Sequence, residues 1–348
     1  MAANDVERVD RIEIERLALW MDQRDLPGPG EPLRAEFISG GASNEIFRLE
    51  RGGQRMVLRR PPRRVPEGRN RTMLREYRVL AALADSDVPH ARVLACCEDA
   101  EVLGACFYIM DFVDGWSPLG GLPSPFDTDP KAKRGLATEL VDAIACLGQV
   151  DWRAVGLEGF GKPEGFLERQ VDRWLHHLSR IKIREIPGLD IAAHWLREHI
   201  PPSYKPGIIH GDYQFANVMF HHDAPARMAA VVDWEMSTVG DPLLDLGWVL
   251  MGWVDPGEET GQVGYFDYAG MPTREELMHR YSVRSGLSVD RIDYYIVLAR
   301  FKMACVLEAG YARYLEGGAD NPKMAAFGDV VLDMGRRAAE LAQTSKLN

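Results

Sequence analysis

The most informative segment of this chain reads His210-Gly211-Asp212-Tyr213-Gln214-Phe215-Ala216-Asn217, and Asp233 lies sixteen positions after Asn217. Phosphoryl transfer asks a protein for a group that accepts the hydroxyl proton and for oxygen ligands that hold magnesium. Asp212 is the predicted catalytic base. Asn217 and Asp233 are the predicted metal ligands, because amide and carboxylate oxygens are the hard ligands that Mg²⁺ prefers.

The sequence around these residues predicts a hairpin. Residues 218–220 and 228–232 are short apolar runs, and residues 221–226, His-His-Asp-Ala-Pro-Ala, form a turn-rich linker between them. Such a hairpin would bring Asn217, at the start of its first strand, beside Asp233, at the end of its second. Taken singly, each of the three polar residues is explained as a turn or cap residue. Their joint spacing favours the phosphoryl-transfer interpretation.

Length, charge and cysteine content bound the class of protein. The chain has 348 residues, which suits two lobes, and a formal net charge of -11, which argues against a nucleic-acid partner. The N-terminus lacks a signal-peptide pattern, and no apolar run reaches the ~18 residues of a membrane span. We therefore expect a cytoplasmic protein without membrane contact. The five cysteines lack metal-binding spacings, so we expect reduced thiols without a zinc site.

Periodicity divides the chain into a β-rich part and a helical part. Strand patterns occupy residues 37–38, 46–49, 55–59 and 105–110, accompanied by helical patterns at 9–21 and 71–83. Long helical patterns follow at 131–147, 166–181, 191–199, 274–285, 289–314 and 324–342, and Thr273 with Glu276 predicts a capping box. The predicted fold class is α+β, with a small β-rich lobe at 1–112 and a larger helical lobe at 113–348.

A glycine-containing turn between the first two strands is a candidate phosphate loop. The backbone of Gly41 and the side chains of Ser43 and Asn44 would donate hydrogen bonds to phosphate oxygens. An isolated Gly-Gly pair is more often a plain hairpin turn. The interpretation as a phosphate loop therefore depends on the third predicted strand, residues 55–59.

The third predicted strand carries Val57 and Arg59, which alternation places on one face. Val57 would press on a nucleotide base while Arg59 reaches its phosphates, and Glu76 on the next helix would orient the guanidinium through an ion pair. The alternative is that Arg59 and Glu76 are ordinary solvated charges. The Asp212 motif favours the functional interpretation.

These residues carry a resemblance to the aminoglycoside phosphotransferase family, small-molecule kinases with a protein-kinase-like fold. The resemblance extends from about Phe37 to Trp253. The segment around Asp212 is similar to the family's catalytic loop, and that around Asp233 to its metal-binding segment. The resemblance implies a bilobal fold that binds ATP and Mg²⁺. It further implies nucleotide contacts from the hinge residues Asp111 and Val113, and a structural brace at Asp245.

Within the family, three segments look most like the kinase branch fused or related to acyl-CoA dehydrogenases, which is associated with hydroxy-acyl substrates. They are Val57-Leu58-Arg59-Arg60-Pro61-Pro62, Arg169-Gln170-Val171-Asp172-Arg173-Trp174, and Asp233-Trp234-Glu235 with Gly240-Asp241-Pro242-Leu243-Leu244-Asp245-Leu246. Arg59 departs from the lysine usual in kinases, which changes the geometry of the phosphate contacts. Only eleven residues separate Asp233 from Asp245. A peptide-docking segment does not fit there, so a small-molecule acceptor is expected.

The expected function is transfer of the γ-phosphate of ATP to a small-molecule hydroxyl. Aminoglycoside phosphorylation, and with it antibiotic resistance, is one interpretation. A metabolic kinase of a hydroxy-acyl-CoA or other alcohol is the alternative, and a non-catalytic nucleotide-binding module is a second. Asp255, Glu258 and Glu259 could receive a cationic sugar, although such an acidic run is more often a solvated loop. Arg169 and Arg173 could instead receive a carboxylate or CoA phosphate.

Overall fold

The computed structural model describes residues 12–40, 44–62, 68–181, 183–258, 266–317 and 322–348. Contacts divide the chain into two compact units. Unit 1 comprises Met1–Gly115, Val155–Leu157 and Ala229–Glu235, and unit 2 comprises Trp116–Ala154, Glu158–Met228 and Met236–Asn348. The lobes 1–112 and 113–348 stay a prediction about domain organisation.

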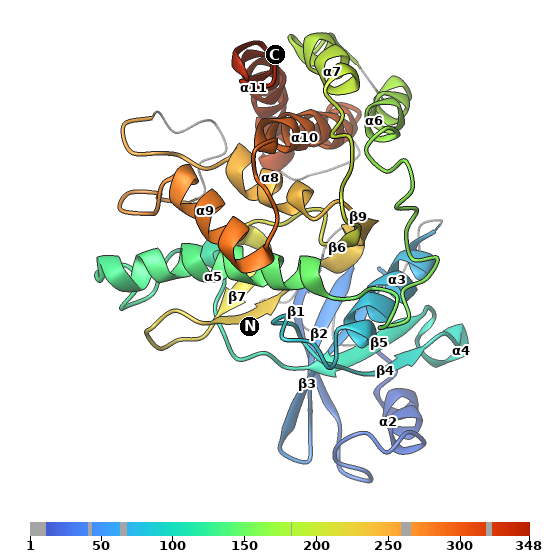
Figure 1. Ribbon diagram of the computed structural model, residues 1–348. Coiled ribbons are helices and arrows are strands. Elements are labelled where there is room, and N and C mark those ends of the chain that lie inside the picture. The colour runs from blue at the N-terminus through green and yellow to red at the C-terminus, as the bar shows by residue number, and fades with distance from the viewer. Residues whose placement is uncertain (1–11, 41–43, 63–67, 182, 259–265, 318–321) are drawn as a thin grey trace. The chain divides into compact units, whose positions relative to one another are not determined.

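Unit 1 is built on a five-stranded antiparallel sheet of order β1-β2-β3-β5-β4 (Figure 1). The strands are β1 (Arg34–Gly40), β2 (Glu45–Arg51), β3 (Gln54–Arg60), β4 (Val93–Cys97) and β5 (Phe107–Asp111). Burial alternates along β2, as expected for a strand with one face on a core. Arg59 on β3 pairs in register with Tyr108 on β5. The sheet therefore brings a charged side chain of one central strand beside a tyrosine of the next.

The helices of unit 1 are α2 (Ile14–Asp22), α3 (Arg69–Ala82) and the single turn α4 (Ala100–Leu103). α2 buries Leu17, Trp20 and Met21 in a core shared with sheet residues, and Trp20 meets Phe107 edge to face at 4.9 Å. α3 packs against β4 and β5. Its buried face includes one charged residue, Glu76. A carboxylate on a buried helix face needs a partner, and Arg59 on β3 is that partner.

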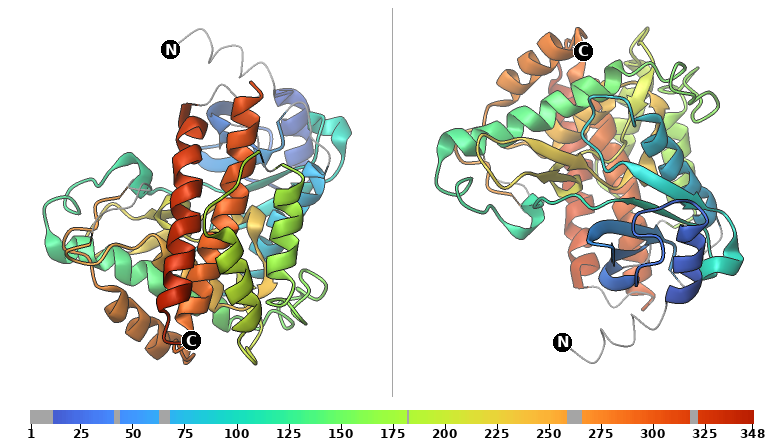
Figure 2. Two further views of the ribbon diagram at one scale, coloured as in Figure 1. Left: turned by 90° about the horizontal axis from the view of Figure 1, so that it is seen from above. Right: turned by 90° about the horizontal axis from the view of Figure 1, so that it is seen from below.

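Unit 2 is mainly helical. Its helices are α5 (Pro130–Gln149), α6 (Gln170–Ser179), α7 (Leu189–Glu198), α8 (Leu243–Met251), α9 (Arg274–Ser285), α10 (Ile292–Leu315) and α11 (Pro322–Thr344). The long helices α10 and α11 lie side by side (Figure 2), and α10 also packs on α8. The predicted capping box of α9 is confirmed, since Thr273 and Glu276 exchange both hydrogen bonds.

Short strands position the functional loops. β6 (Gly207–Ile209) pairs antiparallel with β9 (Thr238–Gly240), and β7 (Val218–Phe220) forms a two-stranded sheet with β8 (Met228–Val231). The predicted hairpin strands are thus confirmed. Single turns of 3₁₀ helix occur at η1 (Pro118–Gly120), η2 (Phe215–Asn217) and η3 (Trp234–Met236).

The α+β class is confirmed, with several local differences. The strands β4, β6 and β9 and the helices α4 and α8 were not predicted. The helix predicted for residues 166–181 begins later, at Gln170, because Phe166 belongs to the preceding turns. All nine residues of α8 are buried, so it carries no amphipathic period. Among the described helices, none is both long and apolar enough to cross a bilayer.

Candidate active site

The predicted catalytic loop, residues 210–217, leaves β6 and ends at β7 in unit 2. Two side chains donate to the carboxylate of Asp212: Gln214 Nε2 to Oδ1 at 3.0 Å and Asn217 Nδ2 to Oδ2 at 2.9 Å. Asn217 also donates to the Asp212 carbonyl at 2.8 Å. The loop therefore brings together two of the predicted residues. Since the Asn217 nitrogen faces Asp212, its amide oxygen is the atom it can offer to a cation.

Asp245 on α8 holds this loop through two hydrogen bonds. Its carboxylate accepts the backbone N–H of His210 at 2.6 Å and that of Gly211 at 2.8 Å. Burial raises the pKa of Asp245, while His210 and these N–H donors act in the opposite direction. His210 is fully buried, and its Nδ1 accepts the Asp212 N–H at 3.3 Å. The predicted brace is confirmed, and His210 supports the loop from within the core.

Gly211 has a conformation that few other residues adopt. Its φ is +84°, and a Cβ placed there would lie 2.6 Å from the carbonyl oxygen of Met236. Both the left-handed backbone and the close approach require glycine. The sharp turn after β6 therefore depends on this position.

Lys302 on α10 contacts the loop at Gly211, and the sequence analysis did not predict this contact. Its Nζ donates to the carbonyl oxygen of Gly211 and lies 4.4 Å from the ring centre of Trp248. Burial lowers the pKa of Lys302 to about 8, against the opposing effect of Asp212 and Asp245. The sequence signal that points to Lys302 is a lysine within the mostly apolar middle of α10.

In unit 1, Arg59 joins two carboxylates. Its Nε lies 2.9 Å from Glu76 and its Nη2 lies 2.8 Å from Asp233, so the predicted pair with Glu76 is confirmed. Tyr108, which the sequence did not reveal, donates to Glu76 at 3.0 Å. Burial raises the pKa of Glu76 to about 7, although Arg59 opposes this change. For Arg59 itself burial acts to lower the pKa, and Tyr108, Glu76 and Asp233 together raise it.

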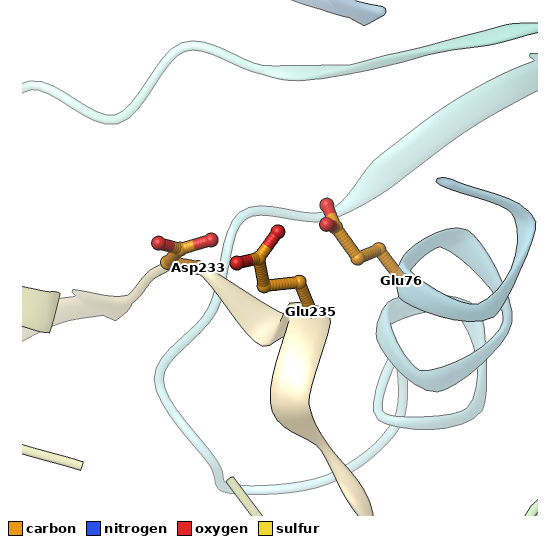
Figure 3. Close-up of side chains that lie close together, drawn as sticks. All are labelled: Glu76, Asp233 and Glu235. Atoms are coloured by element: carbon orange, nitrogen blue, oxygen red, sulfur yellow. The ribbon is translucent and has the colours of Figure 1, made fainter. Parts of the chain in front are cut away.

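Three carboxylates converge beside Arg59. Figure 3 shows Glu76 projecting from α3 toward Asp233 and Glu235, and an oxygen of each lies within 4.8 Å of the others. Asp233 has a φ of 65°, a strained value for a residue with a side chain. Glu235 pairs with Arg69 at 2.9 Å. This all-oxygen donor set fits a hard cation such as Mg²⁺. Glu235, to which the sequence analysis gave no role, belongs to this cluster.

The other predicted nucleotide contacts are placed unevenly. Gly41 and Ser43 lie outside the described residues. Asn44 is buried immediately before β2, and Val57 is buried on β3 opposite Met110. Asp111 ends β5, and Val113 follows it half-buried. Their contacts with a nucleotide stay predictions.

The acidic residues predicted to favour a cationic acceptor are engaged elsewhere. Arg274 binds Asp255 at 3.1 Å and Glu258 at 2.8 Å, and its hydrogen bond lowers the pKa of Glu258. Glu259 lies outside the described residues. This part of the loop after Trp253 is therefore an internal ion-pair network.

The arginines predicted to favour an anionic acceptor make different contacts. Arg169 donates to the main-chain carbonyl of Lys162 at 2.5 Å, and the guanidinium of Arg173 lies 5.2 Å from the ring centre of Trp174. Neither of these contacts supplies a negative counter-charge.

Known proteins resemble this chain over most of its length. A chicken (Gallus gallus) protein, acyl-CoA dehydrogenase family member 11, is 33% identical over 98% of this chain, which spans 45% of that relative's length. A crystal structure of a candidate aminoglycoside phosphotransferase from Ralstonia eutropha superposes with a TM-score of 0.82 at 35% identity, covering 95% of this chain and 98% of that one.

More distant structures share the fold. An aminoglycoside phosphotransferase in complex with ADP and hygromycin B has a TM-score of 0.58 at 14% identity, covering 94% of this chain and 98% of that one. The kinase-like fold expected from the sequence is therefore confirmed. Residues 34–280 match the model of the phosphotransferase enzyme family. The chain belongs to this family.

Proposed function

We propose that this protein transfers the γ-phosphoryl group of ATP to a hydroxyl of a small molecule in a Mg²⁺-dependent reaction. The observation that carries the proposal is the Asp212 carboxylate, oriented by Gln214 and Asn217 on a loop that Asp245 holds through two backbone N–H groups. A fixed carboxylate is what positions and deprotonates an attacking hydroxyl.

In the proposed reaction, Asp212 accepts the proton of the acceptor hydroxyl. The hydroxyl oxygen forms a bond to the γ-phosphorus as the bond between that phosphorus and the β,γ-bridging oxygen breaks. ADP keeps the bridging oxygen, and the phosphate ester leaves with the transferred group. The hydrogen bonds from Gln214 and Asn217 keep the carboxylate of Asp212 directed at the acceptor.

The remaining roles concern the nucleotide. Arg59 would bind its phosphates, Val57 its base, and Gly41, Ser43 and Asn44 the phosphate oxygens, with Asp111 and Val113 at the adenine. Asn217 and Asp233 would hold Mg²⁺, which when bound neutralises phosphate charge. The cluster of Asp233 with Glu76 and Glu235 supports this assignment because its oxygens converge.

Two acceptor classes compete for this site. An aminoglycoside is polycationic, and the acidic residues that would have favoured it, Asp255 and Glu258, are paired with Arg274. A hydroxy-acyl acceptor is supported by the relative named as an acyl-CoA dehydrogenase family member and by Arg169 and Arg173. We therefore propose that the acceptor is a metabolic alcohol rather than an antibiotic. Among metabolic alcohols, a hydroxy-acyl thioester is the preferred candidate.

The test is transfer of ³²P from γ-labelled ATP with Mg²⁺ to a panel of hydroxy-acyl-CoAs, amino alcohols, sugars and aminoglycosides. Labelled product from a hydroxy-acyl-CoA supports the preferred acceptor, and labelled aminoglycoside overturns that preference. Tight ATP binding without product from any acceptor would favour a non-catalytic nucleotide-binding module.

A further inference from the structure

The catalytic loop is held through both polar groups of one residue. The N–H of Gly211 donates to Asp245 on α8 at 2.8 Å, and the carbonyl oxygen of Gly211 accepts from Nζ of Lys302 on α10. Gly211 immediately precedes Asp212 in the chain, so the peptide group between them is the one that Lys302 holds. Rotation of this peptide would redirect the backbone from which the base projects.

The environment of Lys302 restricts its ammonium group to this contact. The residue is 5% exposed. Its Nζ faces the rings of Trp248 at 4.4 Å and Trp174 at 5.6 Å, two aromatic faces that attract a cation. An aromatic face attracts a cation but accepts an N–H only weakly, so the Gly211 carbonyl is the strong acceptor that Nζ reaches among the described residues.

Lys302 also brings a positive charge toward the base. Asp212 and Asp245 both favour its protonated form, while Arg173 opposes it. A buried cation is costly unless its contacts compensate for lost hydration. A neutral residue of the same length would fill the same space between the tryptophans, so packing alone does not account for a lysine here.

We propose that Lys302 is a positioning residue for phosphoryl transfer, which fixes the Gly211–Asp212 peptide by donating to its carbonyl oxygen and so sets the orientation of the Asp212 carboxylate. This inference rests on the proposed role of Asp212 as base. Lys302 does not touch the substrate in this account; it acts through the loop.

Arg300 supplies a matched control on the same helix. It is 8% exposed, and it too donates only to main-chain carbonyls in the contacts made by the described residues: Met251 at 3.2 Å and Arg337 at 2.9 Å. Neither carbonyl belongs to the catalytic loop. Lys302→Met and Arg300→Met therefore remove comparable buried cations, and only the first releases the loop.

The first arm of the experiment is kinetic. For Lys302→Met we expect kcat to fall about 10- to 100-fold, the cost of a misplaced catalytic group, with the KM for ATP changed less than about twofold. Lys302→Arg, which keeps charge and donors, should recover part of kcat. Arg300→Met should keep the wild-type kcat. Full turnover in Lys302→Met, or an equal loss in Arg300→Met, would overturn the proposal.

The second arm needs no acceptor. Native-state hydrogen exchange of a peptide covering residues 207–213 should quicken about tenfold in Lys302→Met, because the loop opens locally, and stay unchanged in Arg300→Met. Unchanged exchange in Lys302→Met overturns the loop contact as a positioning device. If the wild-type protein phosphorylates no acceptor, the proposed function fails, and the exchange result still decides whether Lys302 fixes the loop.

Discussion

Nη2 of Arg59 lies 2.8 Å from Oδ1 of Asp233, although the two residues are 174 positions apart in the chain. The same guanidinium holds Glu76 through its Nε at 2.9 Å. One arginine therefore balances two carboxylates within unit 1. Arginine, with a planar array of donors, makes both contacts at once, which gives a physical reason for the departure from the usual lysine.

Removing Arg59 should destabilise the protein through Glu76. Glu76 is 1% exposed, so Arg59→Met would leave a buried carboxylate without its cation and lower the free energy of unfolding by about 3–5 kcal/mol. The double variant Arg59→Met/Glu76→Gln should recover much of this loss, because the buried charge is gone as well. Urea unfolding, monitored by circular dichroism, measures the free energy of unfolding of the single and the double variant. A single variant as stable as wild type would contradict the account.

Gly211→Ala separates a steric clash from backbone strain. A Cβ at Gly211 would meet the Met236 carbonyl at 2.6 Å, whereas at Gly257, with φ +90°, it would meet nothing within 4 Å. Gly257→Ala should thus cost only the left-handed strain, about 1–2 kcal/mol of unfolding free energy. We expect Gly211→Ala to cost more and to lower turnover by about 10²-fold, because the base moves with the loop. Equal effects of the two variants in unfolding and turnover assays would refute the clash.

Asp241 should make stability depend on pH. Burial raises the pKa of Asp241 to about 6, while hydrogen bonds from Tyr295 and the Leu243 N–H oppose this change. Because the folded-state pKa exceeds the unfolded one, this carboxyl group stabilises the fold below its ordinary pKa. As the pH rises from about 4 to about 6, this contribution is lost. The loss is at most about 3 kcal/mol of the free energy of unfolding.

Asp241→Asn keeps an acceptor oxygen for Tyr295 but cannot ionise. The difference in unfolding free energy, wild type minus Asp241→Asn, should therefore fall as the pH rises between about 4 and 7, and level off above. Urea unfolding of both proteins across this range measures it. A difference that stays constant with pH would show that Asp241 is not held in its protonated form.

The residues that follow one another closely in the chain were predictable. The spacing of Asp212 and Asn217 indicated a loop that joins them, and the Thr273 motif indicated a helix start; both are present. Local hydrogen bonds depend on nearby sequence, so a single segment contains the necessary information. The ion pair between Arg59 and Glu76 was also predictable, although only with the support of the downstream Asp212 motif.

The features that escaped prediction depend on distant partners or lack a period. Lys302 meets Gly211 across 91 positions of sequence, and Tyr108 meets Glu76 across 32, so neither contact leaves a local pattern. α8 is buried on every side, which removes the amphipathic signal of a helix. The acidic residues Asp255 and Glu258 suggested a ligand because their partner, Arg274, lies on another element.

The most direct test of the central claim compares wild type with Asp212→Asn in two assays, ADP release with the acceptor found in the panel and ATP affinity by calorimetry. The account predicts that turnover falls by about 10²–10⁴-fold while ATP binds as before, because only the proton acceptor is lost. An Asp212→Asn variant that turns over at the wild-type rate would contradict the assignment of Asp212 as the catalytic base.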